Sequence, residues 1–257
     1  MPSWDPALYE RYKRYRDRPA LDLMLQIPRG EPPQEIWDLG CGTGEHAALL
    51  ARRYPHARVH GLDSSPQMIA ECRRRPETVN WVLGDLNAFD TPADLIFTNA
   101  ALQWAPDHQT LFPRLMKLVR PGGVFACQMP MAYESVHHGI LRNTAAEGPW
   151  AEPLKRAVAI RPMLAASDYY DWLAPLSDRV DIWSTQYLHV LEGDDAVVDW
   201  MSGTALRPYF DALEGSPLRE AFLDAFRANI AKAFPVRPDG TTLFPFERLF
   251  IVAQRAP

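Results

Sequence analysis

The sequence lacks the features that mark membrane, secreted and nucleic-acid-binding proteins. None of its apolar runs approaches the roughly 18 residues that a membrane-spanning helix requires, and the charged segment that follows Trp4 to Pro6 is not a signal peptide. The three cysteines, Cys41, Cys72 and Cys127, have no zinc-site or disulfide spacing. A net charge of −5 argues against a nucleic-acid substrate, because phosphate groups are bound by basic surfaces. We expect a cytoplasmic protein that binds neither membrane nor nucleic acid and whose cysteines are reduced and structural.

The sequence also lacks the residue spacings that are typical of metal-binding motifs. His108, His137 and His138 have no carboxylate or further histidine placed as in the motif H-E-x-x-H. We therefore expect no metal site. If the substrate presented a hydroxyl or an amine, a general base would be required, and His108 would be the first candidate.

The most informative stretch runs from Ile36 to Gly44, where an apolar segment leads into three glycines at alternate positions. Glycine tolerates positive φ angles and leaves backbone N–H groups open to a ligand. Residues 45–54 then have apolar side chains at helical spacing. The order of strand, glycine loop and helix predicts a nucleotide-binding loop.

The glycine spacing narrows the choice of nucleotide. A dinucleotide-binding fold has the motif G-x-G-x-x-G, and Glu45 stands where its third glycine would be. This disfavours a nicotinamide oxidoreductase. No G-K-[ST] follows the loop, which excludes a Walker loop.

Further segments that resemble strands alternate with helical patterns along the first half of the chain. These segments are residues 57–63, 79–83, 93–99 and 124–129, and residues 120–123 are expected to form a turn before the last one. Strands that alternate with helices imply a parallel sheet with right-handed crossovers. We expect an α/β, doubly wound fold whose ligand lies at the carboxyl ends of the strands.

Asp63 ends the second predicted strand and is the second anchor of the predicted site. It follows Gly44 by 63 − 44 = 19 positions, close to the spacing at which nucleotide-binding folds place a carboxylate for ribose hydroxyls. A carboxylate can accept both hydrogen bonds of a vicinal diol. The alternative is an acid that caps a helix or stabilises a turn.

The segment from Asp38 to Gly44, with Asp85 and Asn99 behind later strands, resembles the motifs of class I S-adenosylmethionine (SAM) dependent methyltransferases. The resemblance implies SAM as cofactor, with Asp85 near the adenine amino group and Asn99 beside the sulfonium and the methyl acceptor. A buried strand followed by a helix cap is the alternative for residues 94–104. The cofactor-binding candidates are Asp38, Gly40, Cys41, Gly42, Gly44, Asp63, Ser64, Met68, Asp85, Leu86 and Asn99.

The rest of the chain is expected to complete the sheet and to cover its strand ends. Two strand-like segments would make the sheet seven-stranded and mostly parallel, and helical pieces would form a cap that selects the substrate. Two interpretations of the basic segment 11–18 remain, namely a mobile lid and a solvated helix face. The expected parts are an N-terminal helical lid segment (1–30), a SAM-binding core (31–129), a cap (130–176 and 193–240) and closing strands (177–192 and 241–257).

Further segments are similar to the bacterial trans-aconitate methyltransferases almost from end to end. They are residues 4–6, 99–108, 128–130, 148–150, 181–183, 206–209 and 244–250. This resemblance implies methyl transfer from SAM to a carboxylate oxygen of trans-aconitate, giving a monomethyl ester and S-adenosylhomocysteine. A carboxylate with a pKa of about 4 is already ionised at pH 7 and needs no general base, so we predict no catalytic base.

An acidic protein that binds a tricarboxylate needs local cations, and arginine suits planar, bidentate carboxylate recognition. Each candidate arginine could instead form a surface ion pair, and rings such as Trp183 and Trp200 could belong to the core. Trp104 directly follows the fourth strand and is the ring that we favour for the site. The substrate-binding candidates are Trp104, Gln128, Trp150, Arg161, Arg207, Tyr209 and Arg248.

Two other functions stay open on the sequence alone. The first is a SAM-dependent methyltransferase for another small carboxylic acid or a secondary metabolite. The second is a SAM-binding protein without turnover, which the intact motif at the fourth strand disfavours. A monomer and a dimer are both compatible with the sequence.

Overall fold

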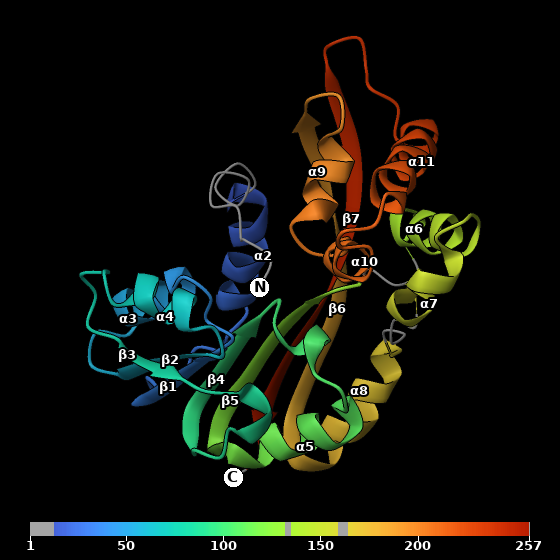
Figure 1. Cartoon of the computed structure of the whole chain (residues 1–257). Coiled ribbons are helices and arrows are strands. Elements are labelled where there is room, and N and C mark those ends of the chain that lie inside the picture. The colour runs from blue at the N-terminus through green and yellow to red at the C-terminus, as the bar shows by residue number, and fades with distance from the viewer. Residues whose placement is uncertain (1–12, 132–134, 159–163, 257) are drawn as a thin grey trace. The chain divides into compact units, whose positions relative to one another are not determined.

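The computed structural model describes residues 13–131, 135–158 and 164–256, which form two compact units (Figure 1). The sheet unit comprises residues 17–130, 164–185 and 248–256 of the described chain. The helical unit comprises residues 13–16, 131, 135–158 and 186–247. Trp4 to Pro6 and Arg161, which the sequence singled out, lie outside the described residues.

Among the described residues, seven strands form one sheet in the order β3-β2-β1-β4-β5-β7-β6. Strands β1 to β5 are parallel, and β7 runs antiparallel to β5. This confirms the predicted seven-stranded, mostly parallel sheet. The strands are β1 (Glu35–Leu39), β2 (Arg58–Asp63), β3 (Asn80–Leu83), β4 (Ala93–Asn99), β5 (Val119–Pro130), β6 (Ser177–Glu192) and β7 (Thr241–Arg255).

Strand β5 begins at Val119, earlier than the predicted start at residue 124. Residues 120–123 therefore lie inside the strand, and the prediction of a turn before it is wrong. The pairing with β4 is irregular between Ala93 and Leu95, where β5 carries extra residues. Gly122 has a φ of +77°, and a Cβ on Gly123 would lie 2.5 Å from the carbonyl oxygen of Asp94. The two glycines therefore shape a bulge inside the strand instead of a turn before it.

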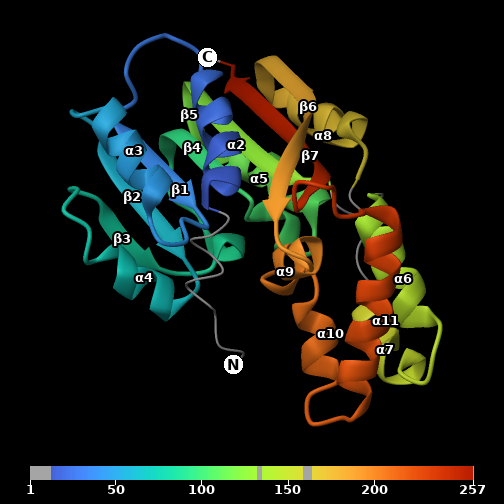
Figure 2. The same ribbon diagram turned by 90° about the horizontal axis from the view of Figure 1, so that it is seen from above.

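Helices cover both faces of the sheet, as a doubly wound fold requires. Helices α3 (Glu45–Arg53) and α4 (Pro66–Cys72) lie beside β1 to β3 (Figure 2). His46 of α3 contacts the ring of Phe97, whereas Phe112 of α5 (His108–Leu118) packs edge-on against Phe125. Phe125 pairs with Ile96, the neighbour of Phe97. Adjacent strand residues point to opposite faces, so α3 and α5 lie on opposite sides of the sheet.

Short polar caps set the starts of these helices. Ser65 accepts a hydrogen bond from the backbone N–H of Met68, and Pro66 is the first residue of α4, where proline favours a helix start. Asp107 caps α5 in the same way. The remaining elements of this unit are η1 (Leu86–Ala88), η2 (Leu102–Trp104), α8 (Ala166–Leu173), η3 (Ala174–Leu176) and most of α2 (Lys13–Leu25).

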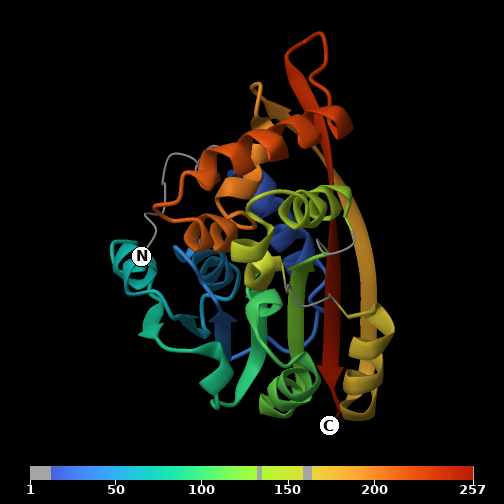
Figure 3. The same ribbon diagram turned by 45° about the vertical axis from the view of Figure 1, so that its right-hand side comes forward.

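The helical unit has its own apolar core, rich in aromatic side chains. Figure 3 shows the ribbon of its helices. Phe222, Phe226 and Ile230 lie four residues apart on one face of α11 (Leu218–Ala233) and are buried. Each such side chain stabilises the unit by about 1.5–3 kcal/mol relative to an exposed one. The helices are α6 (Val136–Ala146), α7 (Ala151–Val158), α9 (Ala196–Ser202), α10 (Arg207–Ala212) and α11 (Leu218–Ala233).

Candidate functional site

The glycine loop between β1 and α3 has a backbone that favours glycine at three positions. Gly40, Gly42 and Gly44 have φ angles of +74°, +56° and +84°. A Cβ on Gly40 would lie 2.3 Å from the Cβ of Ala101, and one on Gly44 would lie 2.6 Å from the Trp81 ring. A Cβ on Gly42 would meet nothing within 4 Å. The space beside Gly42 is therefore open, and its glycine is required by backbone conformation alone.

Asp63 fastens this loop to the start of α4. One carboxylate oxygen accepts a 2.9 Å hydrogen bond from the N–H of Gly42, and the other accepts one of the same length from the N–H of Ser65. This is the turn-stabilising arrangement that the sequence left open as an alternative. Each carboxylate oxygen has a second lone pair, so the predicted contact with a ribose diol stays a prediction.

Asp38 lies buried beneath the loop, at the carboxyl end of β1, with 1% of its surface exposed. Burial raises the pKa of this carboxyl to about 7; the nearby Asp63 adds to the rise, while His46 and the Ala47 N–H oppose it. Its Oδ2 atom has no hydrogen-bond partner among the described residues. A carboxyl in this position exchanges its proton near neutral pH.

Asp85 and Asn99 stand at the carboxyl ends of β3 and β4, where the sequence placed them. Asp85 caps η1, because its Oδ1 accepts 2.8 Å hydrogen bonds from the backbone and the side chain of Asn87. The Oδ1 of Asn99 is buried without a partner in the described part of the chain. Asn99 therefore presents a polar atom that nothing in the described protein satisfies.

Ala100, directly after Asn99, was not predicted and has an unusual conformation. Its φ is +54°, in the left-handed region that favours glycine, and its N–H donates to the carbonyl of Gln128. Such strain is concentrated at functional sites in proteins. Nothing in the sequence signals it, because alanine is common in ordinary turns and helices.

The other cofactor candidates differ in exposure. Cys41 is buried against Cys72, and this thiol contact together with burial raises the pKa of Cys41 far above its usual range. Its thiol therefore faces away from solvent. Ser64 is exposed, whereas Met68 and Leu86 are half-buried.

His108 is held by both of its ring nitrogens. The Nε2 atom lies 2.8 Å from the carbonyl oxygen of Leu102, which can only accept, so Nε2 donates and Nδ1 accepts from the Tyr169 hydroxyl at 2.7 Å. Burial lowers the pKa of His137 to about 3 and that of His138 to about 4. At pH 7 His137 and His138 are therefore neutral, and both ring nitrogens of His108 are engaged by the protein.

Two substrate candidates meet beside Asn99 in the sheet unit. Asn99 pairs with Gln128 across β4 and β5, and Arg248 pairs with Pro130 across β5 and β7. The Nη1 atom of Arg248 donates to the Oε1 atom of Gln128 at 3.3 Å. Both side chains are buried, with 0% and 4% exposure. The sheet thus gathers an amide, a second amide and a guanidinium at neighbouring strand ends.

The remaining substrate candidates lie elsewhere. Trp104 is 63% exposed on η2 in the sheet unit. Trp150 and Tyr209 are buried in the core of the helical unit, and the Trp150 indole donates to the Thr144 carbonyl at 2.7 Å. Arg207 is half-buried at the start of α10.

Of the two rings named as possible core residues, Trp200 is buried in the core of the helical unit. Trp183 is half-buried and stacks on Phe250 with 4.9 Å between ring centroids.

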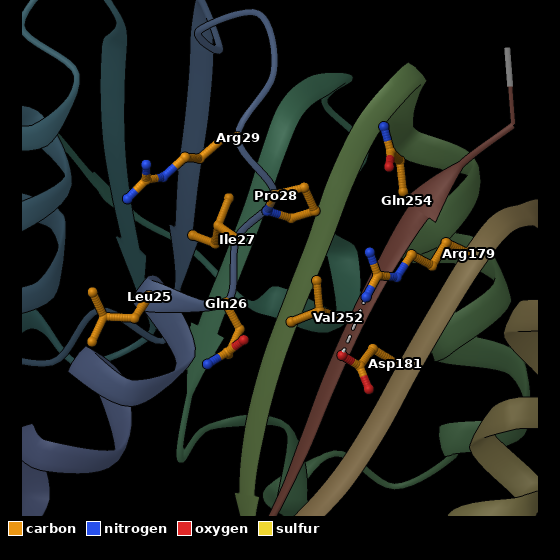
Figure 4. A pocket seen from close by; sticks show the side chains of 9 residues that line it. All are labelled: Leu25, Gln26, Ile27, Pro28, Arg29, Arg179, Asp181, Val252 and Gln254. Atoms are coloured by element: carbon orange, nitrogen blue, oxygen red, sulfur yellow. Dashed lines mark ion pairs between the residues drawn. The ribbon is translucent and has the colours of Figure 1, made fainter.

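A hollow of about 220 Å³ opens on the sheet unit, away from the glycine loop (Figure 4). The end of α2 and the following residues form one wall, and β6 and β7 form the other. Its lining residues Val252 and Gln254 pair with Ala126 and Val124, toward the start of β5. The hollow is therefore displaced from Asn99 along the strands, toward the start of β5.

Within the described residues, no three His, Cys, Asp or Glu side chains are grouped so that they could hold a metal ion. None of the described helices has both the length and the apolar character that crossing a membrane requires.

Known proteins with similar structures have the same fold. The YcgJ protein of Bacillus subtilis superposes with a TM-score of 0.59 at 14% identity, over 93% of this chain and 99% of that one. The geranyl diphosphate C-methyltransferase of Streptomyces coelicolor A3(2), solved with S-adenosyl-L-homocysteine, superposes with a TM-score of 0.53 at 16% identity, over 97% and 82%. These likenesses confirm the predicted fold class.

Sequence comparison gives closer relatives. A family model described as a methyltransferase domain matches residues 36–123. The trans-aconitate 2-methyltransferase of Azoarcus sp. (strain BH72) is 46% identical over 99% of this chain and 100% of its own length. That of Variovorax paradoxus (strain S110) is 44% identical over 99% of both chains. The chain therefore belongs to the family of the trans-aconitate 2-methyltransferases.

Proposed function

We propose that this protein transfers the methyl group of SAM to a carboxylate oxygen of trans-aconitate. The bond between the sulfonium sulfur and the methyl carbon breaks, and its electron pair stays on sulfur. A new bond forms between the methyl carbon and the carboxylate oxygen. The products are a monomethyl ester and S-adenosylhomocysteine, and no proton is gained or lost.

The observation that carries this proposal is the similarity over the full length of the chain. Eight relatives with the name trans-aconitate 2-methyltransferase are 42–46% identical over at least 98% of this chain. The similarity thus includes the helical unit. It is not limited to the sheet unit, whose fold is shared by methyltransferases with other substrates.

The cofactor residues proposed from the sequence fit the site as it stands. The open space beside Gly42 leaves room for a ligand close to the backbone. The Asp63 carboxylate would accept from the ribose hydroxyls, Asp85 from the adenine amino group, and the unpartnered Asn99 oxygen would lie near the reacting methyl group. Cys41 supports the loop from its buried side.

The chemistry requires positioning and not proton transfer. The acid is ionised at neutral pH, and His108, whose two ring nitrogens are both engaged, is not needed as a base. Holding oxygen, carbon and sulfur in line can supply about 7–11 kcal/mol of the barrier reduction. Arg248 and Arg207 are proposed to bind carboxylates of the acid, with Gln128 holding the Arg248 guanidinium in place.

The test is a comparison of acids as methyl acceptors. We expect trans-aconitate to have a higher kcat/KM than other di- and tricarboxylic acids when each is incubated with SAM. An inert trans-aconitate beside an active different acid would contradict the substrate and leave a methyltransferase of another small acid. Tight SAM binding without transfer to any acid would instead indicate a SAM-binding protein without turnover.

We also propose a cytoplasmic location. The three cysteines are free thiols in the structure, as expected in a reducing compartment.

A further inference from the structure

Among the described residues of the helical unit, buried polar atoms of Tyr209 and His138 lack a hydrogen-bond partner. The hydroxyl of Tyr209 is one, on a side chain with 0% exposure, and the Nδ1 atom of His138 is the other. Neither has a hydrogen-bond partner among the described residues. Buried polar groups in proteins are almost always paired, so each points to a ligand that supplies the missing partner.

Arg142 lies close enough to both side chains for its charge to act on them. His138 and Arg142 are four residues apart on α6, so they share one face of this helix. A chain of contacts in the core connects Tyr209 with α6. The Tyr209 ring stacks on Phe222, and Phe222 packs edge-on against Trp150. The indole of Trp150 in turn donates to Thr144 of α6.

The charge of Arg142 acts on both partners. Burial raises the pKa of Tyr209 to about 12, and Arg142 opposes this rise. Burial lowers the pKa of His138 to about 4, and Arg142 lowers it further. Both groups are therefore neutral at pH 7, where the phenol can donate a hydrogen bond and the imidazole can donate from one nitrogen.

We propose that Arg142, Tyr209 and His138 form a subsite for a carboxylate group within the helical unit. A guanidinium has five N–H donors and binds carboxylates in a bidentate manner, so it can serve a ligand in addition to protein partners. The Tyr209 hydroxyl and the His138 ring add neutral donors. Resting on the proposed function, the occupant is a carboxylate of the tricarboxylic acid.

The first experiment measures acid binding without turnover. Titration of trans-aconitate into the protein saturated with S-adenosylhomocysteine allows no methyl transfer. We expect Arg142→Gln to weaken acid binding on the order of 10- to 100-fold, as for loss of a charge-assisted hydrogen bond, with unchanged affinity for S-adenosylhomocysteine. Arg156→Gln, an exposed arginine on α7, is the matched control and should bind the acid like the native chain.

Tyr209→Phe separates a ligand-binding role from a structural one. The variant removes only the hydroxyl, so the aromatic packing is kept. We expect several-fold weaker acid binding together with an equal or higher melting temperature of the free protein, because a buried hydroxyl without a partner does not stabilise it. A lowered melting temperature with unchanged acid binding would overturn the subsite.

The outcomes distinguish the subsite from the proposed function. If trans-aconitate is methylated with the same KM by Arg142→Gln as by the native protein, the subsite is wrong and the function stands. If the native protein binds the acid through Arg142 but esterifies no acid, the subsite stands and the function is wrong. Further support would be loss of the native preference for a tricarboxylate over a dicarboxylate in Arg142→Gln.

Discussion

At the scale of single residues, the account depends most on Asp63. Its carboxylate holds the N–H groups of Gly42 and Ser65 at 2.9 Å each and so ties the glycine loop to α4. The Asp63 side chain therefore stabilises the loop and, as we propose, also binds the cofactor. The two can be separated by measuring stability and cofactor affinity on the same variant.

We predict that Asp63→Ala weakens SAM binding at least 10-fold. The variant loses the proposed acceptor for the ribose hydroxyls and leaves two backbone N–H groups without their partner, which also costs about 1–3 kcal/mol of stability. Calorimetric titration with SAM and urea unfolding measure the two effects. Asp178→Ala, at an exposed position on β6, is the control, and an Asp63→Ala protein with native SAM affinity would exclude Asp63 from the site.

Asp38 is predicted to make the free energy of unfolding of the free protein depend on pH. Its folded-state pKa of about 7 lies above the unfolded value near 3.8, so the folded state binds the proton more tightly. This stabilisation is complete below about pH 4 and is lost as the pH rises toward 7. Urea unfolding of native protein and Asp38→Asn should show the native protein losing about 2 kcal/mol relative to the variant between pH 5 and pH 8. A constant difference would contradict the buried, protonated carboxyl.

At the scale of elements, the glycine loop is the part whose role can be tested by matched substitutions. Gly42 and Gly122 both have positive φ, at +56° and +77°, and a Cβ on either meets nothing within 4 Å. Alanine at either position therefore introduces the same backbone strain and no clash. The two positions differ in their place relative to the proposed cofactor site.

We predict that Gly42→Ala and Gly122→Ala each lose about 1–2 kcal/mol of stability from the left-handed conformation. Only Gly42→Ala should also lose SAM affinity, by at least 10-fold, because its methyl group would occupy the space proposed for the cofactor. Thermal unfolding and SAM titration of both variants provide the comparison. Equal SAM affinity in the two variants would count against the loop as the cofactor site.

The sequence predicted elements well where the signal is local. The bounds of β1 to β4, the Ser65 cap and the buried stripe of α11 follow from periodicity and capping residues that lie within one segment. The bulge in β5 was read as a turn, since Pro-Gly-Gly is typical of both. Only the pairing with Ala93 and Leu95 distinguishes them.

Relations between distant segments could not be predicted in the same way. Arg248 and Gln128 are 120 positions apart and meet because β7 is antiparallel to β5. The strain at Ala100 and the approach of Arg142 to Tyr209 likewise depend on packing between elements, which has no signal in either segment alone. For this reason the sequence could propose a cofactor loop and could name His108 as a base for a hydroxyl or amine substrate, but it could not show that both ring nitrogens of His108 have partners.

At the scale of the whole molecule, the helical unit is expected to respond to the acid and not to the cofactor alone. The proposed cofactor contacts lie in the sheet unit, and the proposed carboxylate subsite lies in the helical unit. Hydrogen exchange reports on each unit separately. Hydrogen exchange can therefore test which ligand protects which unit, without a structure of the complex.

We predict that S-adenosylhomocysteine alone slows exchange mainly in residues 38–45, 63–68 and 85–99 of the sheet unit. Addition of trans-aconitate should then slow exchange in α6 and α10, because the acid joins those helices through Arg142 and Tyr209. The Arg142→Gln protein should show the first effect and not the second. Protection of α6 and α10 by S-adenosylhomocysteine alone would contradict the assignment.

The central claim is that this chain esterifies trans-aconitate, and product analysis tests it most directly. The protein is incubated with trans-aconitate and SAM that carries a 13C-labelled methyl group, and the products are identified by NMR and mass spectrometry. The account predicts a labelled monomethyl ester in an amount equal to the S-adenosylhomocysteine formed. Label recovered in no ester of trans-aconitate, while the same preparation methylates another acid, would contradict it.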